Sequence, residues 1–286
     1  MEGTAHGSIF DYAPAVRARC EGSRNIGMQR GKQSRHVGLA RALSKLGYCS
    51  RSKAAQLIRA GRVRLNGTTR KDPETPVRLP QDRIEVDGKA CAASAKIYLL
   101  LNKPRGLVTT ASDEKGRETV YSCLSEELPW VGPVGRLDKA SEGLLLLTND
   151  SEWASRISDP HTRLDKTYHV QVNVVADENL AAAMVQGVRA GKGELLRAKQ
   201  ARVLRAGGRN AWLEIILDGG KNRQIRRMFD QLGIGVLRLV RVAIGPLHLG
   251  KTGKGKFRAL TGDEKGLLDQ AMGADSGRAR SEVKEY

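Results

Sequence analysis

Several residue types are scarce in this chain of 286 residues, and each scarcity excludes a class of protein. The four cysteines are widely spaced without a C-x-x-C pair, which argues against a disulfide framework and against a zinc site. No apolar run reaches the roughly eighteen residues of a membrane-spanning helix. The N-terminal residues lack an apolar segment followed by a small-residue cleavage site. We therefore expect a reduced, cytoplasmic protein that holds no metal and is not bound to a membrane.

Acidic residues are also scarce relative to basic ones. The chain carries 49 Lys and Arg against 31 Asp and Glu, a formal charge of +18 with a pI near 10.1. Such a balance indicates a polyanionic partner, nucleic acid first and an anionic membrane second. Aromatic residues make up only 4% of the chain, so a tyrosine beside a motif carries weight.

One segment, residues 135–150, stands out by its pattern: Gly-Arg-Leu-Asp-Lys-Ala-Ser-Glu-Gly followed by Leu-Leu-Leu-Leu-Thr-Asn-Asp. Its four consecutive leucines lie between Gly143 and the turn-forming residues 148–150. This pattern is typical of a short strand buried on both faces, although periodicity alone also allows a buried helical turn.

A single carboxylate, Asp138, precedes that apolar run, between the cations Arg136 and Lys139. Nearby positive charge favours the ionised form, so Asp138 should be charged at neutral pH. A charged aspartate in a glycine-flanked loop beside a rigid strand is a common arrangement for a nucleophile. Most loop aspartates, however, cap turns or pair with an adjacent arginine, so these residues alone leave a purely structural role open.

The segment resembles the catalytic-aspartate motif of the RsuA-type family of ribosomal RNA pseudouridine synthases. The resemblance implies that Asp138 is the nucleophile and that Arg136 contacts the RNA backbone. In that family, a Lys-x-Tyr segment supplies a tyrosine that lies against the target base, which here corresponds to Tyr168 in a predicted strand at 166–172. The residues alone favour an ordinary packed aromatic at this position. The family's catalytic domain also begins with a Lys-Pro-x-Gly turn, which makes Lys103 and Arg105 expected RNA contacts.

A second dense motif covers residues 219–229, Gly-Gly-Lys-Asn-Arg-Gln-Ile-Arg-Arg-Met-Phe. Its apolar residues have helical spacing, which predicts a helix that begins near Asn222 and ends at Gly233. A helix N-terminus favours anions, and the cations here are expected to hold phosphates unless they only decorate the surface. These cations are Lys221, Arg223, Arg226 and Arg227. In the resembling family an arginine of this motif contacts the catalytic aspartate, and by position that arginine is Arg226.

Residues 36–90 form a basic module, with twelve Lys and Arg against five Asp and Glu between His36 and Lys89. The pattern predicts a helix near residues 39–46, a second helix capped by Ser50, and small strands that turn at residues 66–67 and 87–88. The module resembles the alpha-L RNA-binding domain, which clamps RNA backbone and shape more than it reads bases. A solvated helix face is the alternative for its basic residues. The expected RNA contacts are Arg41, Lys45, Arg51, Lys53, Arg59, Arg62 and Arg64.

These patterns predict an α+β fold, a small helical RNA-binding module followed by a mixed, largely antiparallel sheet with flanking helices. The expected boundaries are a disordered basic tail at 1–35, the module at 36–90, the catalytic domain at 96–270 and a disordered tail at 271–286. Strands are predicted at 97–101, 107–110, 194–206 and 211–217, and the resemblance to the family implies a closing strand at 237–244. Helices are predicted at 152–157 and 177–189, with another one opening at Leu260-Thr261.

The resemblance implies an isomerase that converts a uridine of ribosomal RNA, in the large subunit by overall likeness, to pseudouridine without a cofactor. Its partner would be ribosomal RNA or a pre-ribosomal particle, and the active form would be a monomer. The sequence leaves open whether Asp138 attacks the ribose, attacks the base, or abstracts a ribose proton. Two other functions also remain open, namely a catalytically inactive RNA-binding or ribosome-assembly protein and an aspartate-based glycosidase. The glycosidase is disfavoured because such enzymes usually need two carboxylates, and only Glu142 is nearby.

Overall fold

The computed structural model describes residues 36–162, 164–191 and 193–281. The tail predicted at 1–35 and the last five residues of the chain lie outside the described residues. No helix within the described ranges is both long enough and apolar enough to cross a membrane.

The basic module opens with two short helices, α1 (Leu39–Lys45) and α2 (Arg51–Arg59). Ser50 caps α2, because its side chain accepts a hydrogen bond from the backbone N–H of Lys53, as predicted. The inward-facing leucines and alanines of both helices join the core of the module, while the lysines and arginines stay on the surface.

Short strands complete the module: β1 (Val37–Gly38), β2 (Val63–Leu65), β3 (Thr68–Arg70), β4 (Pro76–Val77), β5 (Ile84–Val86) and β6 (Lys89–Ala90). Four of them form a sheet in the order β3-β2-β5-β6, and β1 pairs with β4. Asn66 and Gly67 both have positive φ, 51° and 80°, as a type I′ hairpin requires. Asp87 and Gly88 repeat this geometry, so both predicted turns are confirmed.

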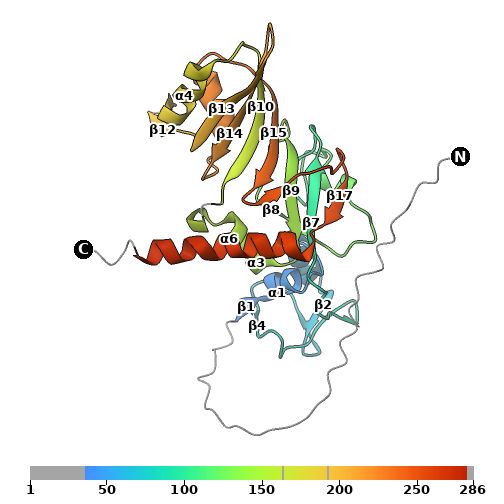
Figure 1. Ribbon diagram of the computed structural model, residues 1–286. Coiled ribbons are helices and arrows are strands. Elements are labelled where there is room, and N and C mark those ends of the chain that lie inside the picture. Colours follow the sequence, from blue (N-terminus) through green and yellow to red (C-terminus); the bar gives the residue numbers. More distant parts are fainter. Residues whose placement is uncertain (1–35, 163, 192, 282–286) are drawn as a thin grey trace, which may run out of the picture. The chain divides into compact units, whose positions relative to one another are not determined.

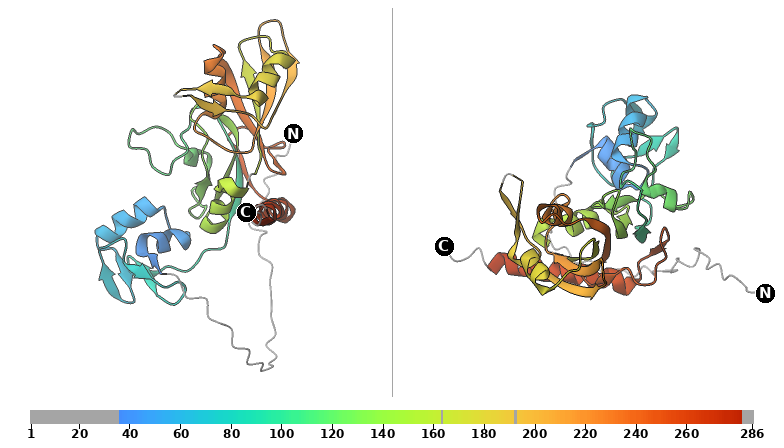
Figure 2. Two further views of the ribbon diagram at one scale, coloured as in Figure 1. Left: turned by 90° about the vertical axis from the view of Figure 1, so that its left-hand side faces the viewer. Right: turned by 90° about the horizontal axis from the view of Figure 1, so that it is seen from above.

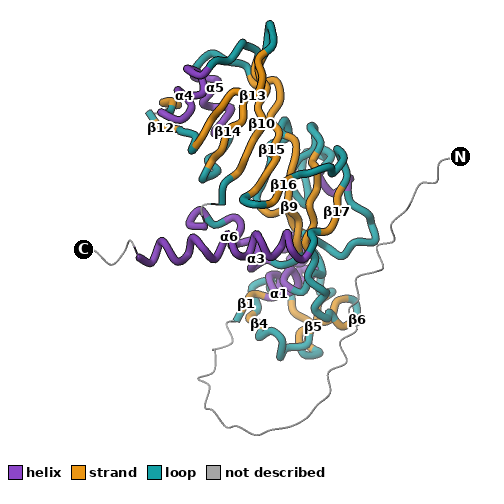
Figure 3. The backbone as a smooth tube through the Cα atoms, in the orientation of Figure 1, coloured by secondary structure: helices purple, strands orange, loops and turns teal. Residues whose placement is uncertain are grey.

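The second part of the chain is built on a nine-stranded sheet (Figures 1 and 3). Its main path runs β13-β14-β10-β15-β9-β7-β17, with β16 beside β15 and β8 beside β9. The strands are β7 (Tyr98–Lys103), β8 (Gly132–Val134), β9 (Glu142–Thr148), β10 (Lys166–Val172), β13 (Gln200–Ala206), β14 (Ala211–Leu217), β15 (Val236–Ile244), β16 (Leu247–His248) and β17 (Phe257–Ala259). Of the pairings between these strands, only β15 with β9 is parallel. The predicted α+β fold with a largely antiparallel sheet is confirmed.

Strand β9 is buried along its whole length, and its four leucines enter two different cores. Leu144 and Leu146 pack into one cluster, which also contains residues of the later helices, whereas Leu145 and Leu147 pack into another. Successive side chains of a strand point to opposite faces, so β9 is covered on both sides. The helical alternative for this run is excluded.

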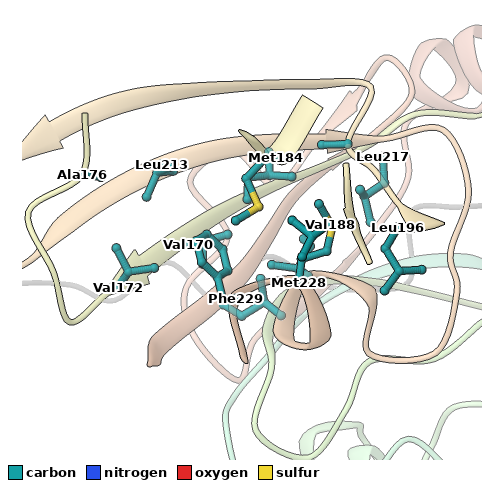
Figure 4. Close-up of a cluster of buried hydrophobic side chains, with 14 of the residues drawn as sticks. Val170, Val172, Ala176, Met184, Val188, Leu196, Leu213, Leu217, Met228 and Phe229 are labelled. Carbon is teal, nitrogen blue, oxygen red and sulfur yellow. The ribbon is translucent and has the colours of Figure 1, made fainter. Parts of the chain in front are cut away.

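Helices cover the faces of the sheet: α3 (Ser151–Ser158), α4 (Glu178–Gln186), α5 (Gln224–Gln231) and α6 (Gly262–Ser281). Figure 4 shows how Met184 of α4 and Met228 and Phe229 of α5 meet Val170 of β10 and Leu213 of β14. Helix α6 packs Leu268 and Met272 beside Trp153 and Ile157 of α3, and the left view of Figure 2 looks along its axis.

Three predicted elements differ from the structure. The strand expected at 107–110 is reduced to one isolated bridge between Val108 and Thr119. The strand expected at 194–206 is divided, because β12 (Glu194–Leu196) forms a separate hairpin with β11 (Val188–Ala190) before β13 begins. The tail predicted at 271–286 is helical as far as Ser281. The opening of α6 is as predicted, with Thr261 and Glu264 in a reciprocal capping box.

Candidate active site

Asp138 lies on the loop between β8 and β9, and the backbone of this loop is anchored on both sides of it. Before it, buried Leu137 exchanges two hydrogen bonds with the Thr109 hydroxyl, which donates to the Leu137 carbonyl at 2.7 Å and accepts from its N–H at 3.3 Å. After it, the Ser141 N–H donates to the Asp138 carbonyl at 2.9 Å. The carboxylate itself remains 35% exposed, so a fixed backbone presents a reactive side chain.

The buried ammonium of Lys103, at the end of β7, is hydrogen-bonded to the backbone of the same loop. Its Nζ donates to the carbonyls of Pro104, Asp138 and Ser141 at 2.9–3.1 Å. Burial lowers the pKa of Lys103 to about 8, although the carboxylates of Asp138 and Glu142 favour its charged form. Lys103 is 0% exposed, so its predicted contact with RNA is wrong and its observed role is to hold the loop.

A cleft of about 390 Å³ opens beside Asp138. This volume falls within the roughly 300–1,000 Å³ typical of ligand pockets. The cleft brings together the Asp138 loop, strand β10 and the segment before α5. Its lining includes Arg136, Asp138, Ser141, Lys166, Tyr168, Lys221, Arg223, Leu239 and Arg241.

Tyr168 projects from β10 into this cleft and is half-buried between two apolar clusters. The part of Tyr168 that lines the cleft offers an aromatic surface on which a flat ligand can pack. His169 lies on the other face of the strand, where its Nε2 is 3.3 Å from a carboxylate oxygen of Glu214. Neighbouring residues of the strand thus point to opposite faces, and of these two only Tyr168 lines the cleft of Asp138.

The arginines around α5 are arranged differently from the prediction. The helix begins at Gln224, and its N-cap residue, Arg223, adopts a left-handed conformation with φ 47° and ψ 33°. This turn places Nη1 of Arg223 at 3.8 Å from a carboxylate oxygen of Asp138. That separation is an electrostatic contact between charges and exceeds hydrogen-bond length.

Arg226, which we expected to contact Asp138, instead binds the backbone of the loop. Its Nη2 donates to the Ala140 carbonyl at 3.0 Å, and Nη1 lies 3.5 Å from the Val236 carbonyl. Burial lowers the pKa of Arg226, with a smaller contribution from the charge of Arg223. The predicted ion pair is therefore made by Arg223, one turn earlier, because the left-handed residue changes where the helix begins.

These contacts predict different effects for the two arginines. Arg226→Ala should lower both melting temperature and turnover, because a charged donor to a backbone carbonyl is worth about 1.5–3 kcal/mol. Arg223→Ala should reduce turnover roughly tenfold but leave the melting temperature almost unchanged, because exposed ion pairs contribute about 0–1 kcal/mol. Thermal melts and single-turnover rates measure both effects. A larger loss of stability in Arg223→Ala than in Arg226→Ala would contradict this assignment.

The other predicted RNA contacts of the second part of the chain lie at or near the surface. Arg136 is exposed at the cleft. Arg105 is exposed, with Nη1 3.5 Å from the Leu237 carbonyl. Lys221 and Arg227 both pair with Glu194, at 3.0 and 2.6 Å, which partly neutralises them.

In the basic module, five of the seven predicted contacts are exposed without an ion pair among the described residues. They are Arg41, Arg51, Lys53, Arg59 and Arg64. The other two have partners, since Arg62 forms a two-pronged ion pair with Asp87 and Lys45 lies 2.9 Å from Glu152.

Sequence reasoning missed two cations in the cleft, Lys166 and Arg241. A signal for Arg241 was present. Strand β15 alternates, and Leu239, Arg241 and Ala243 occupy its buried phase. A charged residue in the buried phase of an apolar strand is unusual and points to a specific role.

Comparison with known proteins agrees with this geometry. Residues 97–231 match the model of the RNA pseudouridylate synthase family, and residues 37–84 match the S4 domain. An uncharacterized RNA pseudouridine synthase of Aquifex aeolicus is 38% identical over 238 residues, which cover 83% of this chain and 95% of that protein. The ribosomal large subunit pseudouridine synthase B of Bacillus subtilis is 35% identical over 228 residues, 79% of this chain and 93% of that protein.

A solved structure described as a pseudouridylate synthase shares the fold, with 30% sequence identity and a TM-score of 0.56. The match covers 81% of this chain and 99% of that one. The fold, the cleft around Asp138 and these relatives agree, and the chain belongs to the RNA pseudouridine synthases.

Proposed function

We propose that this protein isomerises a specific uridine in the ribosomal RNA of the large subunit to pseudouridine, with Asp138 as the nucleophile. The proposal rests on the position of Asp138. Its carboxylate is carried by an anchored loop and lines a cleft together with Tyr168 and Arg223. The choice of the large subunit is supported by the name of the Bacillus subtilis relative.

The reaction exchanges one bond to the ribose for another. The N1–C1′ bond breaks, the uracil turns while it is held, and a C5–C1′ bond forms. The hydrogen at C5 leaves as a proton, and N1 gains a proton, so no oxidant or reductant is consumed. Asp138 provides the nucleophile, Arg223 places its positive charge 3.8 Å from that carboxylate, and Tyr168 packs against the uracil.

A carboxylate in a cleft cannot reach a base inside a helix, so the target must be extruded from its stack. The exposed cations of the basic module would hold the surrounding RNA by its phosphates. We further propose that the partner is ribosomal RNA or a pre-ribosomal particle, and that the protein acts as a monomer in the cytoplasm.

The contribution of the module can be measured by salt dependence. The triple variant Arg51→Gln, Lys53→Gln, Arg59→Gln should lower the log–log salt slope of RNA binding by about 2–3, because each phosphate that the protein neutralises adds about 0.7–0.9 to the slope. Arg62→Gln is the matched control and should change the slope less, because Arg62 is already paired with Asp87. An unchanged slope in the triple variant would show that these residues are only solvated.

The proposed activity is tested with large-subunit ribosomal RNA that carries tritium at C5 of its uridines. The purified protein should release tritium, because C5 must lose its hydrogen to bond to the ribose. Pseudouridine mapping in cells that lack the protein should then identify one missing site. RNA binding without tritium release, on free RNA and on pre-ribosomal particles, would instead support an inactive RNA-binding protein.

A further inference from the structure

Arg241 is buried in strand β15, and its guanidinium is incompletely paired. Only 5% of the residue is exposed. Its Nε donates to the Leu144 carbonyl at 2.8 Å, whereas Nη2 is enclosed and has no hydrogen-bond partner among the described residues. Buried polar nitrogens are nearly always paired, and an unpaired buried charge is costly.

The strand register places Arg241 at the centre of the site. Strand β15 runs between β10 and β9 (Figure 1), where Arg241 pairs with Tyr168 on one side and with Gly143 on the other. Its side chain lines the same cleft as Asp138. Arg241 therefore lies in the sheet between Tyr168 and the first residues of β9, which follow the loop that carries Asp138.

Lys166 adds a second cation to this part of the cleft. Burial lowers its pKa, and the charge of Arg241 lowers it further. The described residues place no carboxylate within ion-pair distance of Lys166, and neighbouring Asp165 is paired with Lys199 at 2.8 Å. The carboxylates of Asp165 and Asp218 act on Lys166 only from beyond ion-pair distance and do not offset this lowering of its pKa. Two neighbouring cations without an ion-pair partner among the described residues are suited to an acceptor from the substrate.

The burial of Arg241 and Lys166 distinguishes between two substrate groups that could accept their hydrogen bonds, a phosphodiester and a uracil. A phosphodiester is bulky and hydrated, and Arg136, which is exposed at the cleft and has no ion pair among the described residues, is available to it. A flipped uracil is flat and carries two carbonyl oxygens at its edge. When the N1–C1′ bond breaks, the bonding electrons stay with the ring and spread over N1 and both oxygens. Fixed positive charge stabilises such developing negative charge most strongly in a buried site.

We propose that Arg241, together with Lys166, binds the carbonyl oxygens of the target uracil and stabilises the negative charge of the ring while it is detached from the ribose. This inference rests on the proposed function. It makes Arg241 a catalytic residue and explains why Nη2 of a buried arginine has no hydrogen-bond partner among the described residues. The electrons return to the ribose through C5 when the new bond forms.

The first test replaces Arg241 with methionine, which fills similar space without charge, and with lysine, which keeps the charge but loses the planar group. Arg241→Met should lower single-turnover tritium release about 100-fold or more, and Arg241→Lys should retain part of the rate. The melting temperature of Arg241→Met should be equal to or above that of the wild type, because an unpaired buried charge is removed. If both variants lose tritium release in proportion to a fall in melting temperature, Arg241 has only a structural role and the proposal is overturned.

The second test separates the base from the phosphate. Binding is compared for two RNA fragments centred on the mapped uridine, one intact and one without the base at that nucleotide. Arg241→Met should weaken binding of the intact fragment but not of the abasic one, whereas Arg136→Met should weaken both equally. Equal weakening of both fragments by Arg241→Met would assign it to phosphate and overturn the proposal. If the wild-type protein releases no tritium, the proposed function itself is refuted. If the wild type releases tritium and Arg241→Met releases it equally fast, only the role of Arg241 is refuted.

Discussion

Asp138→Asn is expected to lower pseudouridine formation by at least about a thousandfold while RNA affinity stays within a few-fold. Asparagine keeps the size and shape of the side chain but cannot act as a nucleophile or as a base, and loss of a nucleophile costs several orders of magnitude. The loop should survive the change, because Thr109, Lys103 and Ser141 hold its backbone and not the carboxylate. Single-turnover tritium release and a binding titration measure the two quantities separately.

The matched control is Asp230→Asn, which removes the charge of an exposed aspartate on α5 outside the lining of the cleft. Its turnover should remain close to that of the wild type. Turnover above about one hundredth of wild type in Asp138→Asn would remove Asp138 from the nucleophile role.

Gly143→Ala should strongly lower both the free energy of unfolding and turnover, because it disturbs the backbone. Gly143 has φ +101°, and an added Cβ would lie 2.2 Å from the carbonyl oxygen and 2.8 Å from the nitrogen of Arg241. Both are backbone atoms of the adjacent strand, so they cannot move without separating β15 from β9. The strained φ and the clash should together cost about 3 kcal/mol or more of unfolding free energy. Turnover should fall with it, because this pairing holds the Asp138 loop beside Tyr168.

Gly135→Ala isolates the conformational part of that cost. Gly135 lies in the same motif with φ +70°, but an added Cβ would meet open space. Gly135→Ala should therefore lower the free energy of unfolding by only about 1–2 kcal/mol. Denaturant unfolding of the two variants measures the difference, and equal losses would show that the close approach to Arg241 is unimportant.

Elements defined by local chemistry were predictable from the sequence. The leucine run of β9, the Asn66-Gly67 and Asp87-Gly88 turns and the Ser50 cap each depend on a few adjacent residues. The region of the site was also predictable, because Asp138 and Tyr168 lie in segments whose patterns are distinctive. Both side chains do line one cleft.

The destinations of long cationic side chains were not predictable in the same way. Lys103 was expected to contact RNA from a turn. It is instead the last residue of a buried strand, and its ammonium reaches three backbone carbonyls, two of them in the distant Asp138 loop. The exchange between Arg226 and Arg223 depends on one left-handed residue. Arginine seldom adopts that conformation, so helical periodicity placed the start of α5 too early.

The parallel pairing of β15 with β9 also has a consequence for the order of events during synthesis. It joins residues 142–143 to residues 240–241, so a ribosome must translate about a hundred further residues before the loop of Asp138 meets its neighbouring strand. The basic module consists of local contacts and can fold while the remainder is still being made. A nascent chain should thus acquire affinity for RNA well before it acquires the ability to alter it.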